Sequence, residues 1–177
     1  MSSSPPDLTV DADVLMNLLA SEHIEAILAV NGLRGLVCPR TEAEAIYLNP
    51  RSPGLPRERI DIEQLVAAGV LARTVLDAAE TSTFVRLAGL VDDGEAQVLA
   101  VAVHRSLPVA TDDRKARRLA IDLGLSVLST PELVTAWASR AAAAESAAAV
   151  LDVEVRANYR PRAADPLRSE WDRLKAG

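Results

Sequence analysis

The stretch "LTVDADVLMNLLAS", residues 8–21, decides the fold, because a short apolar run gives way in it to a helical pattern. Residues 8–10 are predicted to form a buried strand, and leucines at helical spacing follow from Leu15 onward. Asp11 and Asp13 stand between the two patterns. A single aspartate would suffice to cap the helix. The second acid, Asp13, therefore either serves a site at this strand end or is itself the residue that caps the helix.

Strand and helix patterns alternate along the rest of the chain. Such alternation indicates parallel strands joined by helical crossovers, with helices on both faces of the sheet. We therefore predict an α/β fold, a three-layer α/β/α sandwich around a central parallel sheet of four to five strands. The further strands are expected within 35–39, 73–76, 107–110 and 125–129, a loop at 49–59, and helices within 22–30, 39–47, 61–70, 81–90, 95–103, 112–124 and 131–151.

The composition narrows the class of protein. With 177 residues, 49% of them apolar and 25% charged, the chain has the size of one globular domain. A net charge of -6 argues against general electrostatic binding to nucleic acid, although a local basic patch remains compatible with it. The single cysteine, Cys38, excludes an intramolecular disulfide and a thiolate metal cage. Without a signal peptide or an apolar span, we expect a cytoplasmic protein.

Acidic side chains follow the predicted strands at the edge where open α/β sheets bind their ligands. If the strand ends converge, several carboxylates crowd together, and their repulsion favours protonation unless a cation binds. Mg²⁺ or Mn²⁺, which prefer oxygen ligands, would resolve that conflict, activate a water and stabilise a phosphoryl transition state. The acids are Asp11 and Asp13, Glu42 and Glu44, Glu95, and Asp112 and Asp113.

Each acid also has a purely structural explanation. The sequence "DDGE" that ends at Glu95 fits a capping box. Asp112 and Asp113 lie where an N-cap and a first-turn acid favour a helix. Glu42 and Glu44 point about 200° apart on a helix, so only one of them can face the cleft, and helical phase does not decide which. The joint pattern favours function, because every strand-to-helix junction that could border one crevice carries an acid.

Three segments resemble the PIN-domain nucleases, the family that includes VapC-type toxins of bacterial toxin–antitoxin pairs. They are "LTVDADVLMNLLAS" (8–21), "LVCPRTEAEAIYL" (36–48) and "GEAQVLAVAVHRSLPVATDDRKARRLAIDLGLSVLST" (94–130). The resemblance implies a flexible N-terminus at 1–7, a nuclease domain at 8–135, and a C-terminal helix with an Arg-rich tail at 136–177. It implies Asp11, Glu44, Glu95 and Asp113 as catalytic and metal-binding acids, supported by Asp13, Thr111, Asp112 and Glu42, with Glu42 remaining an alternative to Glu44.

The activity that this resemblance implies is metal-dependent endonucleolytic cleavage of single-stranded RNA, or less often DNA. One or two Mg²⁺ or Mn²⁺ ions would activate the attacking water and neutralise charge on the phosphate. The implied setting is the toxin of a type II toxin–antitoxin pair. RNA, an antitoxin protein and a second copy of the chain are then the expected partners, and no membrane is involved.

Basic residues close to the acids are candidates for substrate contacts. Arg114, Lys115 and Arg118 directly follow the fourth group of acids and could bind phosphates, as could the arginines of the 49–59 loop. The structural alternative is that the helical arginines merely solvate an amphipathic face. Because aromatic residues make up only 3% of the chain, recognition of the RNA backbone suits it better than base stacking does.

Two other functions compete with an RNA nuclease. The chain could be an inactive PIN-like binding module whose helix at 131–151 and tail with Trp171 bind a protein partner. The presence of all four candidate acids argues against that interpretation. The motif "VDADV" (10–14) also matches haloacid-dehalogenase-like phosphatases. Their mechanism needs a lysine before the late acids, whereas the two lysines, Lys115 and Lys175, both follow Asp112.

Overall fold

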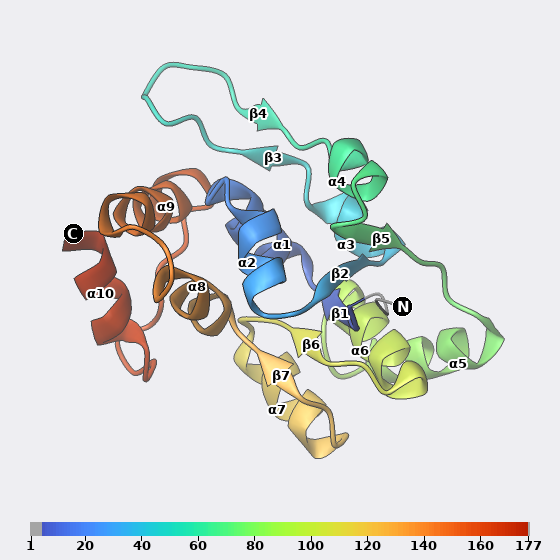
Figure 1. Cartoon of the computed structure of the whole chain (residues 1–177). Helices are drawn as coiled ribbons and strands as arrows, with labels where there is room; N and C mark the ends of the chain where they lie inside the picture. Colours follow the sequence, from blue (N-terminus) through green and yellow to red (C-terminus); the bar gives the residue numbers. More distant parts are fainter. Residues whose placement is uncertain (1–4, 177) are drawn as a thin grey trace.

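The computed structural model describes residues 5–176, and a parallel sheet of five strands runs through its centre (Figure 1). The strand order is β5-β2-β1-β6-β7, and all four pairings are parallel. Central β1 pairs with neighbours on both edges, so that Val10 lies between Val37 and Ala110. The predicted fold class is therefore confirmed. The strands are β1 (Asp7–Val10), β2 (Arg34–Val37), β5 (Leu71–Arg73), β6 (Val109–Ala110) and β7 (Val127–Leu128).

Helices form a layer on each face of this sheet, and each layer buries its own apolar core (Figure 1). One layer consists of α1 (Ala12–Ala20), α2 (Ile24–Val30), α8 (Thr130–Ala138), α9 (Ala143–Arg156) and α10 (Arg168–Ala176). The other consists of α5 (Ala78–Leu87), α6 (Asp93–Arg105) and α7 (Arg114–Asp122), while the short helices α3 (Pro39–Glu44) and α4 (Glu63–Ala67) adjoin β2 and β5.

The central helix α6 accounts for much of the second layer. Its run from Val98 to Ala102 is almost fully buried, because the helix is apolar nearly all round. Cys38 lies in the same core with no exposed surface, and burial raises the pKa of its thiol to about 12, so the thiol is unreactive.

The helix that begins at Pro39 is shorter than predicted. It ends at Glu44 rather than at residue 47, because Ala45 leaves the helical conformation with ψ at 73°. The chain then forms β3 (Tyr47–Leu48), which pairs antiparallel with β4 (Glu58–Arg59). The predicted loop is therefore the tip of a two-stranded hairpin, and strand pairing has replaced the last helical turn.

The next strand and helix are also displaced from their predicted positions. The strand expected at 73–76 forms at 71–73, and the chain leaves the sheet after Thr74, whose amide bonds to the carbonyl of Val37. Helix α5 starts three residues before the predicted position, because Asp77 and Glu80 form a reciprocal capping box. Pairing with β2 therefore sets the position of β5, and the cap at Asp77 sets the start of α5.

The helix predicted at 131–151 is interrupted and forms two helices, α8 and α9, with a break at 139–142. The break allows α8 to pack on α2 while α9 packs on α1 and α10. Trp171 of α10 is fully buried, and its indole N–H donates to Glu154 at 3.2 Å. Trp171 therefore belongs to the core. The suggestion from the sequence that Trp171 contacts a protein partner is wrong.

The central strand begins one residue earlier than predicted. Of the predicted flexible stretch 1–7, residues 1–4 lie outside the described part of the chain, and Asp7 begins β1. The domain limit at residue 135 stays a prediction. No helix in the described residues is long and apolar enough to cross a membrane.

Candidate metal centre

Asp11 lies at the carboxyl end of the central strand and is 6% exposed. Its carboxylate caps α1 by accepting from the amide of Val14 at 2.8 Å, and the hydroxyl of Thr111 donates to it as well. Burial raises the pKa of Asp11 to about 8, and the nearby charges of Asp112 and Asp13 add to the rise. The structure thus answers the question of the two acids. Asp11 is the cap, so the alternative that Asp13 caps the helix is wrong.

Asp13 lies in the first turn of α1 and makes no capping hydrogen bond. Partial burial raises the pKa of its carboxyl, and the charge of Asp113 raises it further. The second acid therefore faces the acids that follow β6. This position is compatible with the expected role of Asp13 in supporting the metal-binding acids.

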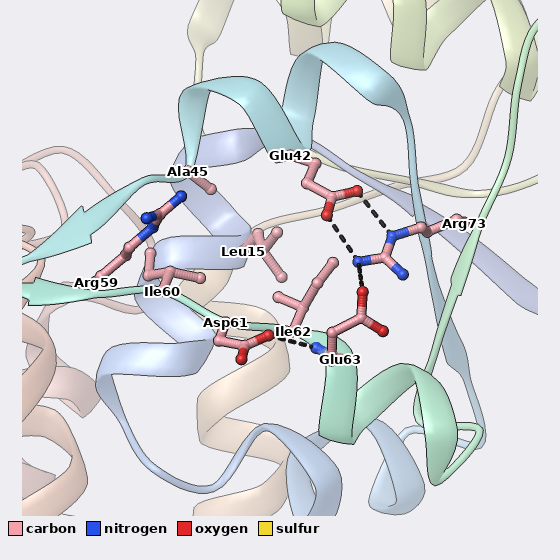
Figure 2. Close-up of a pocket in the computed structure, with 9 residues that line it drawn as sticks. All are labelled: Leu15, Glu42, Ala45, Arg59, Ile60, Asp61, Ile62, Glu63 and Arg73. Carbon is pink, nitrogen blue, oxygen red and sulfur yellow. Dashed lines mark hydrogen bonds and ion pairs between the residues drawn. The ribbon is translucent and has the colours of Figure 1, made fainter.

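Glu42 and Glu44 leave α3 in different directions. The carboxylate of Glu42 forms a bidentate ion pair with Arg73, at 2.8 and 2.9 Å, and Arg73 also contacts Glu63 at 2.8 Å (Figure 2). This pairing lowers the pKa of Glu42. Glu42 is therefore neutralised in a separate cluster.

Glu44 instead lies against the start of α6. A Cβ atom built on Gly94 would be 2.5 Å from Oε2 of Glu44. Partial burial raises the pKa of Glu44, Arg40 opposes the rise, and the charges of Asp13 and neighbouring acids strengthen it. Of the two candidates for the second acid, Glu44 is the one that the structure brings to the others.

Glu95 combines a structural and an electrostatic position. Its Oε2 accepts from the amide of Asp92 at 3.3 Å, as the capping-box interpretation predicted. Burial raises the pKa of Glu95 to about 7, and the charge of Asp113 is the next cause. The cap therefore does not remove Glu95 from the acidic cluster, since its carboxylate still faces Asp113.

Asp112 and Asp113 are adjacent in the chain but have different surroundings. Oδ1 of Asp113 caps α7, accepting from the amides of Lys115 and Ala116 at 2.7 and 2.9 Å. Asp112 accepts from the amide and hydroxyl of Thr130 at 2.9 and 2.6 Å, and from Asn17 at 3.1 Å. Asp112 thus fastens the start of α8, and Asp113 is the member of the pair that is coupled to Glu95 and Asp13.

The donor chemistry of this cluster fits a hard divalent cation. All its groups are carboxylate oxygens, and within residues 5–176 none of the five acids forms an ion pair with an arginine, lysine or histidine. In the same part of the chain, no three acidic, histidine or cysteine side chains converge closely enough to hold a metal together. Binding an ion would therefore draw the acids closer. The five acids, here called the acid cluster, are Asp11, Asp13, Glu44, Glu95 and Asp113.

The basic residues that the sequence suggested as phosphate contacts differ in whether acidic side chains bind them. Arg114, Lys115 and Arg118 are exposed on α7, and over the described residues they form no ion pair with an acidic side chain. Arg51 of the hairpin is held by Asp152 and Glu22, at 2.9 and 2.7 Å, and is not free to reach toward a substrate. The candidates on α7 therefore remain, whereas Arg51 does not.

Two cavities lie beside the acidic residues. The larger, of about 440 Å³, lies between α3, β4 and α4; Arg59 points into it toward Ala45, and Leu15 and Ile62 also line it (Figure 2). A second, of about 270 Å³, adjoins the acid cluster. The acids at the predicted crevice indicated the second cavity, whereas the first carries no sequence signal, because Leu15, Arg59 and Arg73 come together only in the folded chain.

A family model described as a PIN domain, DUF3368, matches residues 8–162. No curated protein matches the chain. The matched region contains all five strands of the central sheet, the acid cluster and helices α1 to α9. The alternative of a haloacid-dehalogenase-like phosphatase gains no support from the comparison.

Proposed function

The chain belongs to the PIN-domain family, whose fold is of the nuclease type, and from that premise we propose that it is a metal-dependent endoribonuclease of single-stranded RNA. The observation that carries the proposal is the acid cluster. Acids from separate elements of the chain lie near enough for the charge of one to raise the pKa of another, and within residues 5–176 none of them forms an ion pair with a basic side chain. Such an arrangement is costly to the fold, and a bound cation offsets that cost.

In this proposal Asp11, Glu44, Glu95 and Asp113 hold the ion, and Asp13 supports them. A divalent ion, Mg²⁺ or Mn²⁺, would lower the pKa of a bound water and neutralise charge on the phosphate during hydrolysis. The hydroxyl of Thr111 and the amide of Val14 fix the orientation of the Asp11 carboxylate. No histidine or serine nucleophile is needed, because the attacking group is water.

Substrate binding falls to the exposed cations of α7. Arg114, Lys115 and Arg118 directly follow the acid cluster and are unpaired within the described residues. They are suited to contact phosphates on either side of the scissile bond, which attracts the RNA despite the net charge of -6.

For the biological setting we propose the toxin of a type II toxin–antitoxin pair, acting as a homodimer in the cytoplasm. The resemblance of three chain segments to VapC-type toxins supports this. Expression of the chain should then arrest growth, and co-expression of a small protein encoded beside it should relieve the arrest. Growth arrest that persists in an Asp11→Asn variant would contradict the proposed toxin activity.

The deciding experiment is cleavage of a mixed single-stranded RNA pool by the purified protein with Mg²⁺, with Mn²⁺ and with EDTA. The Asp11→Asn variant should lose cleavage, because asparagine preserves the helix cap but not the charge. Asp122→Asn is the matched control, since Asp122 is exposed at the far end of α7.

A second readout does not depend on RNA. Mg²⁺ should raise the melting temperature of the wild type and of Asp122→Asn but not that of Asp11→Asn. A folded wild type that neither cuts RNA nor responds to either metal would contradict the proposal and favour an inactive binding module.

A further inference from the structure

The cavity of about 270 Å³ beside the acid cluster is bounded by the turn that joins α5 to α6 and by the first residues of α6 and α7. Glu95 and Asp113, which are proposed to hold the ion, form one side of it, with Lys115 next to them. The turn supplies the rest of the lining. The lining residues are Ala88, Gly89, Leu90, Val91, Asp92, Glu95, Asp113 and Lys115.

The turn offers the cavity both apolar surface and backbone polar groups. Leu90 is 50% exposed and supplies the apolar surface. Over residues 5–176 the amide of Gly89 and the carbonyls of Ala88, Gly89 and Leu90 form no backbone hydrogen bond outside helices and strands, whereas the amides of Leu90 and Val91 bond back to Leu87. Donor and acceptor groups are thus available beside an apolar side chain.

We propose that this cavity binds the base of the nucleotide next to the scissile phosphate in a single-stranded RNA. The inference rests on the proposed function, because an ion held by Glu95 and Asp113 would then fix the phosphate beside these two acids. The base attached to a neighbouring sugar is the part of the nucleotide that can reach the turn. In single-stranded RNA the base has free edges, whose donors and acceptors can form hydrogen bonds with a protein.

The charges around the cavity agree with this orientation. Lys115 is exposed beside Asp113 and can contact the phosphate of the bound nucleotide. The carboxylates of Glu95 and Asp113 are proposed to bind the ion. These carboxylates would repel an anionic group elsewhere in the cavity. An uncharged base accordingly suits the turn, and the phosphate suits the side with Lys115 and the ion.

Gly89 allows the cavity to be filled without disturbing the fold. Its φ lies outside the left-handed region, and a Cβ atom built on it would meet only the carbonyl of Arg86, at an ordinary 3.6 Å. Gly89→Trp therefore introduces a large side chain at the wall of the cavity. Val85→Trp is the matched control, because Val85 is 65% exposed on α5 and does not line the cavity.

The experiment combines these variants with short single-stranded RNA oligonucleotides from which one base at a time has been removed. Affinity is measured by fluorescence anisotropy in Ca²⁺, and kcat/KM of cleavage in Mg²⁺ or Mn²⁺. For the wild type, loss of the base at one nucleotide adjoining the cleavage position should weaken binding by about tenfold, the scale of one or two lost hydrogen bonds. Gly89→Trp should weaken binding of the complete oligonucleotide by a similar factor and should lose its response to that missing base.

Each outcome decides the proposal. If removing the base weakens the binding of Gly89→Trp by the same factor as that of the wild type, the base does not occupy this cavity and the proposal is overturned. The proposal is also overturned if Gly89→Trp binds and cuts RNA like Val85→Trp. A wild type that cuts no RNA with any metal overturns the proposed nuclease function. The anisotropy measurements still test the cavity in that case, so the two failures are distinguishable.

Discussion

Glu44 of α3 lies directly over Gly94 of α6, and a Cβ atom on the glycine would come within 2.5 Å of the glutamate Oε2. The glycine therefore lets the carboxylate approach the start of α6, next to Glu95. This contact joins α3, which follows β2, to α6, which follows α5, and it brings the second acid to the others.

Gly94→Ala should separate catalysis from stability. Alanine is a better helix former than glycine, and the Glu44 carboxylate is the mobile end of a side chain, so the free energy of unfolding should change by no more than about 1 kcal/mol. The displaced carboxylate should lower cleavage by about tenfold or more. Urea unfolding and cleavage rates test this, and unchanged cleavage would show that the position of Glu44 is not needed.

Glu44→Gln and Glu42→Gln should have different effects. Glu44 belongs to the acid cluster, so its substitution should weaken metal affinity and cleavage by about tenfold or more. Glu42 pairs with Arg73 at the surface, so its substitution should cost at most about 1 kcal/mol of stability and leave metal binding unchanged. Calorimetric titration with Mn²⁺ compares them, and the reverse ranking would make Glu42 the second acid.

Substitutions of Asp112 and Asp113 should also have different effects, one mainly on stability and the other mainly on cleavage. Asp112→Ala removes the acceptor for Thr130 and Asn17, which are buried, and should destabilise the fold by about 3 kcal/mol. Asp113→Ala removes a helix cap and should cost about 1 kcal/mol while abolishing cleavage. Chemical denaturation and cleavage measured on both variants test this, and equal stability losses would contradict the assignment.

Glu80 predicts a pH dependence of stability away from the acid cluster. Glu80 is 1% exposed and bonds to Arg105 at 2.6 and 3.0 Å, which lowers its pKa below the ordinary value of 4.5. The ion pair therefore contributes fully above pH 4.5 and is lost as the pH falls through the folded-state pKa. Glu80→Gln should cost about 2 kcal/mol at pH 7.

The difference between wild type and Glu80→Gln should shrink as denaturation is repeated at successively lower pH. Arg173→Ala, which removes an exposed pair with Glu170, should show little effect at any pH. A difference that stays constant below pH 4 would contradict the assignment.

Lys115→Ala should weaken RNA binding chiefly through electrostatics. If Lys115 contacts one phosphate, its loss should reduce the slope of log affinity against log salt by about 0.7 for a single strand. Arg173→Ala is the control, because Arg173 lies on α10 and pairs with Glu170. Anisotropy titrations at several salt concentrations measure the slope, and an unchanged slope would remove Lys115 from the binding surface.

Local patterns in the sequence were enough to predict the α/β class, the central strand at 8–10, the buried helix α6 and the strand ends that carry acids. These features depend on hydrophobic periodicity and on helix caps, which involve residues close together in the chain. The limits of elements were less predictable. Residue 47 lies in a strand and not in the predicted helix, because Tyr47 pairs with Arg59, twelve positions away. Helix α8 ends at Ala138, and α8 and α9 pack on different helices.

The sequence by itself determined which residues are acidic at the strand ends, and that Glu42 and Glu44 cannot both face one cleft. Only the tertiary structure decided between these two glutamates, because Arg73 and Gly94, which separate them, belong to β5 and α6. It also buried Trp171 and formed the cavity beside Glu95. Such contacts depend on how helices pack across a sheet, which no single segment encodes.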